Sequence, residues 1–115
     1  MLKNLTPHPI TIIMPDGEAL TLPPEGIVPR RETETRDTGE TINGIPVVRN
    51  TMGAVQGLPE PEEGVVLVVP FLICQALPDR SDLVAPDTTP DSVVRDDQGR
   101  IVGVRRLQRA YPLKT

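Results

Sequence analysis

The sequence predicts a mainly β fold, a small antiparallel β-barrel or sandwich with one short helix. Its 14 prolines and 9 glycines are spread along the whole chain, and because proline interrupts helices, this spacing favours short strands and turns. The apolar residues fall in short β-branched runs between turn-forming residues, which is typical of strands. Aromatic residues make up only 2% of the chain, so we expect an aliphatic core.

The first element expected is a β-hairpin over residues 10–22, "ITIIMPDGEALTL". A β-branched run is followed by a Pro-Asp-Gly turn at 15–17 and then by four residues that alternate between the two faces of a strand. Gly17 can adopt the positive φ angle that a tight hairpin requires. This is the clearest local signal in the sequence.

The next stretches have weaker patterns. Residues 27–36 alternate Arg, Glu and Thr, as expected for a strand that is polar on both faces. Residues 43–50, "NGIPVVRN", indicate a turn that leads into another strand. Residues 57–64, "GLPEPEEG", are rich in proline and glycine and indicate a long loop.

A continuous apolar run covers residues 63–70, "EGVVLVVP". Such a run is typical of a central strand that is covered on both faces, so we expect Val65 to Val69 to be buried. The following segment 70–77, "PFLICQAL", predicts the single helix, with Pro70 at its first position and Pro78 just beyond its end.

A second hairpin is expected over residues 92–107, "SVVRDDQGRIVGVRRL". The turn from Asp96 to Gly99 separates Val93 and Val94 from a second apolar run, which consists of Ile101, Val102 and Val104. Aspartate at the start and glycine at the end of this turn suit a type I turn followed by a left-handed residue.

Length and charge narrow the function classes. A chain of 115 residues predicts one compact domain over 1–115. The net charge of −4 argues against a nucleic-acid polymer as partner. The segment "MLKNLTPHPI" lacks the long apolar stretch of a signal peptide, and no run approaches the ~20 apolar residues of a membrane helix, so we expect no membrane partner. The single cysteine, Cys74, cannot form an internal disulfide, which fits the cytosol of the host cell.

Residues suited to catalysis are few. The chain has one histidine, His8, one cysteine, Cys74, and two serines, Ser81 and Ser92. A nucleophile needs a neighbouring base, and a thiolate in the apolar stretch around Cys74 would be costly. Residues 95–99, "RDDQG", lack the alternating ligands of a calcium loop. We expect no catalytic residue, no metal and no cofactor.

The only histidine lies in "NLTPHPITI". If this segment is extended, Asn4, Thr6 and His8 share one face. Pro7 and Pro9 cannot donate backbone hydrogen bonds, which predicts a sheet edge or the beginning of a strand. Two roles for His8 remain open, structural bracing and contact with a ligand at a loop rim.

Ten of the twelve basic residues are arginine. A GC-rich genome would explain this bias without a function, whereas several guanidinium groups around one pocket would bind a phosphate or carboxylate. Arg80 stands between Asp79 and Asp82, which predicts either an oriented guanidinium or a surface ion pair. The candidate ligand-binding residues are Asn4, Thr6, His8, Arg49, Arg80, Asp82, Arg95 and Arg105.

Four segments, "NLTPHPITI", "GIPVVRNTMGAVQGLPEPEEG", "ALPDRSDLVAPD" and "VVRDDQGRIVGVRRL", resemble a family of small proteins encoded by tailed phages, prophages and their bacterial hosts. The resemblance covers most of the chain. It implies a phage-type setting and no established enzymatic activity. The chain departs from the family pattern after "GLPEPEEG", where "VVLVVPFL" replaces a strand of Tyr-Ile-Val-Ser type.

Together these observations suggest a non-enzymatic phage-type protein that sequesters a nucleotide second messenger of bacterial antiphage immunity. Arginines would bind the phosphates, and His8 or Thr6 would lie near a base or ribose. We expect a small anionic, nucleotide-like ligand and a homo-oligomer that completes the pocket. One alternative is a protein-interaction module that blocks a host protein through an exposed β edge or the 57–64 loop. A metal-dependent nucleotide hydrolase is a further alternative.

Overall fold

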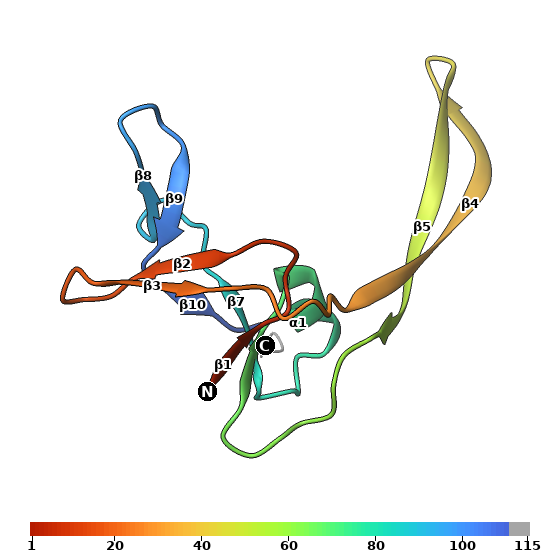
Figure 1. The fold of residues 1–115 in the computed structure, drawn as a ribbon. Helices are drawn as coiled ribbons and strands as arrows, with labels where there is room; N and C mark the ends of the chain where they lie inside the picture. Colours follow the sequence, from red (N-terminus) through yellow and green to blue (C-terminus); the bar gives the residue numbers. More distant parts are fainter. Residues whose placement is uncertain (111–115) are drawn as a thin grey trace, which may run out of the picture.

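The computed structural model describes residues 1–110 and contains three β-sheets and one short helix (Figure 1). The first sheet has the strand order β1-β6-β7-β10, the second β3-β2-β9-β8, and the third consists of β4 and β5. The elements in chain order are β1 (Leu2–Asn4), β2 (Ile10–Ile13), β3 (Ala19–Leu22), β4 (Arg30–Ile42), β5 (Ile45–Gln56), β6 (Val66–Val68), α1 (Phe71–Ala76), β7 (Leu83–Pro86), β8 (Val93–Arg95), β9 (Ile101–Val104) and β10 (Leu107–Gln108).

The apolar run at 63–70 forms the centre of the first sheet. β6 lies between β1 and β7 and is parallel to both, whereas β10 pairs antiparallel with β7. Leu67 and Val69 belong to the main core cluster. Val68, which points to the opposite face by strand alternation, is also fully buried. The prediction of a central strand covered on both faces is confirmed, although Val65 and Val66 are only half-buried.

Helix α1 connects the parallel strands β6 and β7 and contributes to the same core. It has six residues, as expected from the short segment between two prolines. Pro70 is the N-cap, with φ −58° and ψ 144°, so the prediction that it is the first helical residue was off by one position. Ile73 and Cys74 are buried with Leu5, Leu83 and other members of the cluster. The main core is therefore aliphatic.

Both predicted hairpins are present and form the second sheet. β2 and β3 pair antiparallel around a turn in which Gly17 has φ 89°. β8 and β9 pair antiparallel around the 96–99 turn, where Gly99 has φ 79°. Ile12 pairs with Val104 in parallel and thereby joins the two hairpins. Gly103 lies next to this pair, and because it has no side chain, β9 can approach β2 closely at Thr11.

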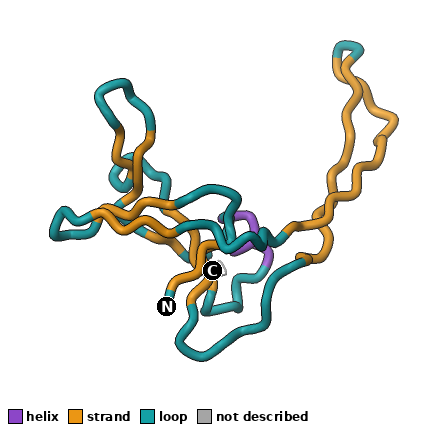
Figure 2. The backbone as a smooth tube through the Cα atoms, in the orientation of Figure 1, coloured by secondary structure: helices purple, strands orange, loops and turns teal. Residues whose placement is uncertain are grey.

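The third sheet is a long β-hairpin that extends away from the rest of the molecule (Figure 2). We call β4 and β5 together the arm. Its turn consists of Asn43 and Gly44, both at positive φ, 50° and 80°, which is the geometry of the tightest hairpin turns. The polar strand predicted over 27–36 is present but begins only at Arg30, and the turn and strand predicted over 43–50 are confirmed. Both β4 and β5 run further than the patterns indicated.

The arm makes the molecule more extended than a compact chain of this length. The Cα radius of gyration is 17.3 Å, compared with about 13 Å expected for a compact domain of similar size. The mainly β class with one short helix is confirmed, and the two four-stranded sheets form a sandwich-like arrangement; residues 1–110 form no closed barrel. Parallel pairing within the first sheet was not anticipated. The single-domain assignment over 1–115 remains a prediction.

Candidate functional site

Asn4 is the centre of a hydrogen-bond network at the N-terminus. Its side chain is 1% exposed. Its Nδ2 donates to the carbonyl oxygens of His8 at 2.8 Å and of Leu22 at 2.9 Å. Its Oδ1 accepts from the Thr6 backbone N–H at 2.9 Å and from the Thr6 hydroxyl at 2.6 Å. The amide thus fixes the bend after β1 and joins it to the end of β3.

His8 enters this network only through its backbone. Its carbonyl oxygen accepts hydrogen bonds, while the residue itself is exposed. β1 is an edge strand of the first sheet. Pro7 and Pro9 lie between β1 and β2, just before β2 begins at Ile10, in agreement with the predicted beginning of a strand. Asn4, Thr6 and His8 therefore lie together, but the chain bends through residues 6–8 instead of staying extended. The geometry gives all three a structural role, and ligand contact by them stays a prediction.

Arg80 and Asp82 form a bidentate ion pair just before β7 begins. Arg80 Nε lies 2.7 Å from Asp82 Oδ1, and Arg80 Nη2 lies 2.7 Å from Asp82 Oδ2. Arg80 Nη2 also donates to the Pro59 carbonyl oxygen at 3.1 Å. The hydrogen bonds from Arg80 lower the pKa of Asp82 and raise that of Arg80. The guanidinium of Arg80 thus contacts groups of its own chain, and it holds the 57–64 loop against the beginning of β7.

The other predicted arginines lie on different elements. Arg49 is on β5 of the arm, where its Cα partner is Arg36. Arg95 is on β8 and donates to the Gly99 carbonyl oxygen at 2.7 Å. Arg105 follows β9, and its backbone N–H donates to the Ser92 carbonyl oxygen at 2.8 Å. The structure does not gather these guanidinium groups with Arg80 in one pocket.

The acidic turn at 95–99 is organised by Asp96. Its carboxylate accepts backbone hydrogen bonds from Gln98 and Arg100, each at 2.9 Å, and pairs with Arg100 Nε at 3.2 Å. The backbone hydrogen bond from Arg100 is the largest cause of its lowered pKa. All these contacts are within the hairpin turn.

Cys74 packs in the main core at 2% exposure. Burial raises the pKa of its thiol, so the neutral form is favoured at neutral pH and nucleophilic attack by this sulfur is disfavoured.

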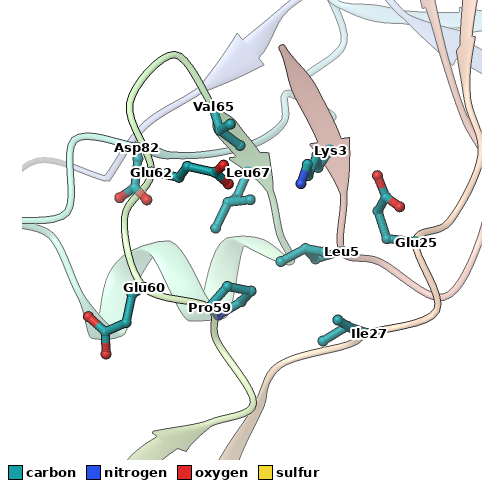
Figure 3. A pocket seen from close by; sticks show the side chains of 10 residues that line it. All are labelled: Lys3, Leu5, Glu25, Ile27, Pro59, Glu60, Glu62, Val65, Leu67 and Asp82. Atoms are coloured by element: carbon teal, nitrogen blue, oxygen red, sulfur yellow. The ribbon is translucent and has the colours of Figure 1, made fainter.

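A small pocket lies beside the beginning of the arm (Figure 3). Its volume is ≈ 120 Å³, below the roughly 300–1,000 Å³ of typical small-molecule sites. Leu5, Leu67 and neighbouring apolar side chains line it, and several carboxylates surround them. The lining consists of Lys3, Leu5, Glu25, Ile27, Pro59, Glu60, Glu62, Val65, Leu67 and Asp82. We call this the acidic pocket.

Charge in the acidic pocket is predominantly negative. Asp82 is paired with Arg80, as described above. Within residues 1–110, Glu25, Glu60 and Glu62 make no ion pair within 4 Å, and Lys3 is the only cation among the lining residues. A phosphate would be repelled by such a rim, whereas a cationic group attached to an apolar stem would fit it.

The arm is a two-stranded sheet whose outer edges pair with no other strand of the described residues. Nearly all of its residues are exposed, and neither strand joins another sheet. Large apolar side chains along it reach water, including Ile42 at 56% and Ile45 at 64% exposure. A two-stranded hairpin alone is only marginally stable in water, so a surface of this kind is typical of a segment that docks on a partner.

Of the predicted site residues, only Asp82 lines the acidic pocket. The glutamates of the 57–64 loop could have been found, because this loop was named as a possible contact for a host protein. The alternation of charges in 27–36 indicated an exposed strand. No local pattern revealed that Lys3 and Leu5 of the N-terminus would face this loop, because β1 and β6 are far apart in the sequence and pair from Leu2 with Val66 to Asn4 with Val68.

Comparison of the chain with protein-family models, with curated proteins and with solved structures gives no match. The resemblance to small phage-encoded proteins therefore remains a prediction. Helix α1 is too short to cross a membrane, and residues 1–110 contain no other helix that is long and apolar enough to do so. Within the same residues, no three His, Cys, Asp or Glu side chains are grouped as a metal site.

Proposed function

We propose that this chain is a non-enzymatic protein-interaction module of phage type that acts in the host cytosol, with the β4–β5 arm as its docking element. The observation that carries the proposal is the arm itself: two strands of 13 and 12 residues that form a sheet of their own and expose apolar side chains on it. Exposed strand edges provide backbone groups for pairing with another chain.

The arrangement of charges supports protein docking more than capture of a nucleotide. The candidate arginines are divided among the arm, the Arg80–Asp82 pair and the second hairpin. The described pocket beside the arm is acidic and small. Sequestration of a nucleotide second messenger stays a prediction that the experiment below also tests.

The test uses a variant with a shortened arm. Thr33 and Met52 are Cα partners, so replacing residues 34–51 by Asn-Gly closes a short hairpin with a favoured turn. The full chain and the variant are immobilised and exposed to bacterial lysate and, separately, to the purified full chain. The captured proteins are identified and then purified for a binding titration. We expect at least one partner that binds the full chain and loses about 100-fold or more in affinity with the shortened arm.

A calorimetric panel of cyclic and ADP-ribose-type nucleotides is measured on both proteins. Stoichiometric heat from a nucleotide that survives arm shortening would contradict the proposal and support a nucleotide sponge. Equal binding of every purified partner to both proteins would contradict it as well. The variant's thermal unfolding serves as the folding control, because the main core lies outside the removed segment.

A further inference from the structure

Three arginines of the arm make no ion pair within the described residues, Arg30 and Arg31 at the base of the arm and Arg49 further along it. Arg36 and Arg49 face each other across the hairpin, and like charges in this position repel. Arg36 is paired with Glu34 at 2.9 Å. Arg49 makes no ion pair in residues 1–110, and by strand alternation it lies on the same face as the exposed Ile45.

The acidic pocket has the complementary chemistry. Apolar side chains line it together with Glu25, Glu60 and Glu62, which make no ion pair within 4 Å in residues 1–110. A volume of ≈ 120 Å³ is suited to one long side chain. Arginine has an aliphatic stem for such apolar side chains and a planar cation for such carboxylates, which is why it is common at the centres of interfaces.

Arg49 cannot reach the acidic pocket of its own molecule. The pocket is lined by the two segments at which the arm begins and ends, through Ile27 before β4 and Pro59 after β5. From there the arm extends outward (Figures 1 and 3). Arg36, the partner of Arg49, is six residues beyond Arg30, or about 20 Å along an extended strand. Only another molecule can bring an Arg49 to this pocket.

We propose that the partner of the arm is a second copy of this chain, whose Arg49 inserts into the acidic pocket and binds Glu62 and its neighbours. Each copy has an Arg49 to donate and one acidic pocket to fill, so reciprocal exchange about a two-fold axis uses both and closes as a dimer. The two arms then run alongside each other in opposite directions. This inference names the partner of the docking element and rests on the proposed function.

The test is a charge-exchange experiment on the purified full chain, followed by sedimentation over a range of concentrations at low and high salt. We expect a monomer–dimer equilibrium that weakens with salt. Arg49→Glu and Glu62→Lys are each expected to weaken the dimer about 100-fold or more, because each dimer contains two junctions and each junction then brings like charges together.

An equimolar mixture of the two variants is the decisive sample. In a mixed dimer both junctions again join opposite charges, so we expect the mixture to dimerise although neither variant does so alone. The matched controls are Arg105→Glu, an exposed arginine outside the arm, and Glu63→Lys, an exposed neighbour of Glu62 that does not line the pocket. Both are expected to dimerise like the unmodified chain.

The outcomes separate this inference from the proposed function. A chain that stays monomeric at every concentration, or a mixture that fails to dimerise, contradicts the second copy as partner; if an arm-dependent partner is still captured from lysate, the proposed function stands. Assembly that continues beyond the dimer contradicts reciprocal exchange. A dimer that persists in the shortened-arm variant contradicts the inference, because the two copies then associate through another surface, and the proposed function is decided by the capture experiment alone.

Discussion

At the scale of single residues, Asn4 and His8 contribute differently to the structure near the N-terminus. Asn4 makes four polar contacts within the chain, whereas the exposed His8 contributes a backbone carbonyl. We predict that Asn4→Ala lowers the free energy of unfolding by about 1–3 kcal/mol, because buried groups lose their partners. His8→Ala is expected to change it by less than about 0.5 kcal/mol. Denaturant titration of both variants measures this, and a larger loss for His8→Ala would contradict the assignment.

The Arg80–Asp82 pair predicts an acid-dependent loss of stability. The bond from Arg80 lowers the pKa of Asp82 in the folded state, so the pair stabilises the fold above the unfolded-state pKa of about 3.9. This contribution is lost as the pH falls through the lower folded-state value. We expect Asp82→Asn to lower the free energy of unfolding by about 1.5–3 kcal/mol at pH 7 and by less at pH 3.

The pH prediction is checked by denaturant unfolding at pH 7, 5, 4 and 3. Asp97→Asn is the control, since Asp97 is exposed and makes no ion pair in residues 1–110. An unfolding free energy for Asp82→Asn that runs parallel to that of the unmodified chain at every pH would show that the ion pair does not stabilise the fold.

At the scale of elements, the joint between β2 and β9 depends on a glycine. A Cβ on Gly103 would lie 3.0 Å from the Thr11 carbonyl oxygen and 3.4 Å from Ile13 Cγ1. We predict that Gly103→Ala costs about 1–3 kcal/mol of stability, since the strands must separate to admit the methyl group. Thermal unfolding measures this cost. Gly53→Ala, where the nearest neighbour is the Glu32 side chain at 3.2 Å, is expected to cost less.

Sequence patterns predicted the elements well where the signal is local. Both hairpins, the 43–44 turn and α1 follow from turn residues and prolines within a few positions of each other. The parallel pairing of β1 with β6 was not predictable in this way, because Leu2 and Val66 are 64 positions apart and no turn connects them. The acidic pocket depends on this long-range pairing, which explains why its lining was largely missed.

At the scale of the whole molecule, the structure combines a buried sheet with an exposed arm. The sequence indicated both components, through the apolar run at 63–70 and the charged alternation at 27–36. It did not indicate that 25 residues of strand would form a separate sheet. Strand alternation shows which face is polar, but whether a polar strand lies at the edge of the body or projects from it depends on tertiary pairing.

The contrast between the exposed arm and the buried strand β6 predicts two classes of backbone amides, which differ in their rate of exchange with solvent. In Arg49→Glu, where the arm is expected to be free, the amides of β4 and β5 should exchange with solvent at least about 100-fold faster than those of Leu67 to Val69, because an undocked hairpin opens readily and buried central strands do not. In the concentrated unmodified chain, the arm amides should become protected as the arm docks. Hydrogen exchange with mass spectrometry measures both. Arm amides as slow as those of β6 in Arg49→Glu would mean that the arm is stable without a partner, and exposure of its apolar side chains would then no longer argue for docking.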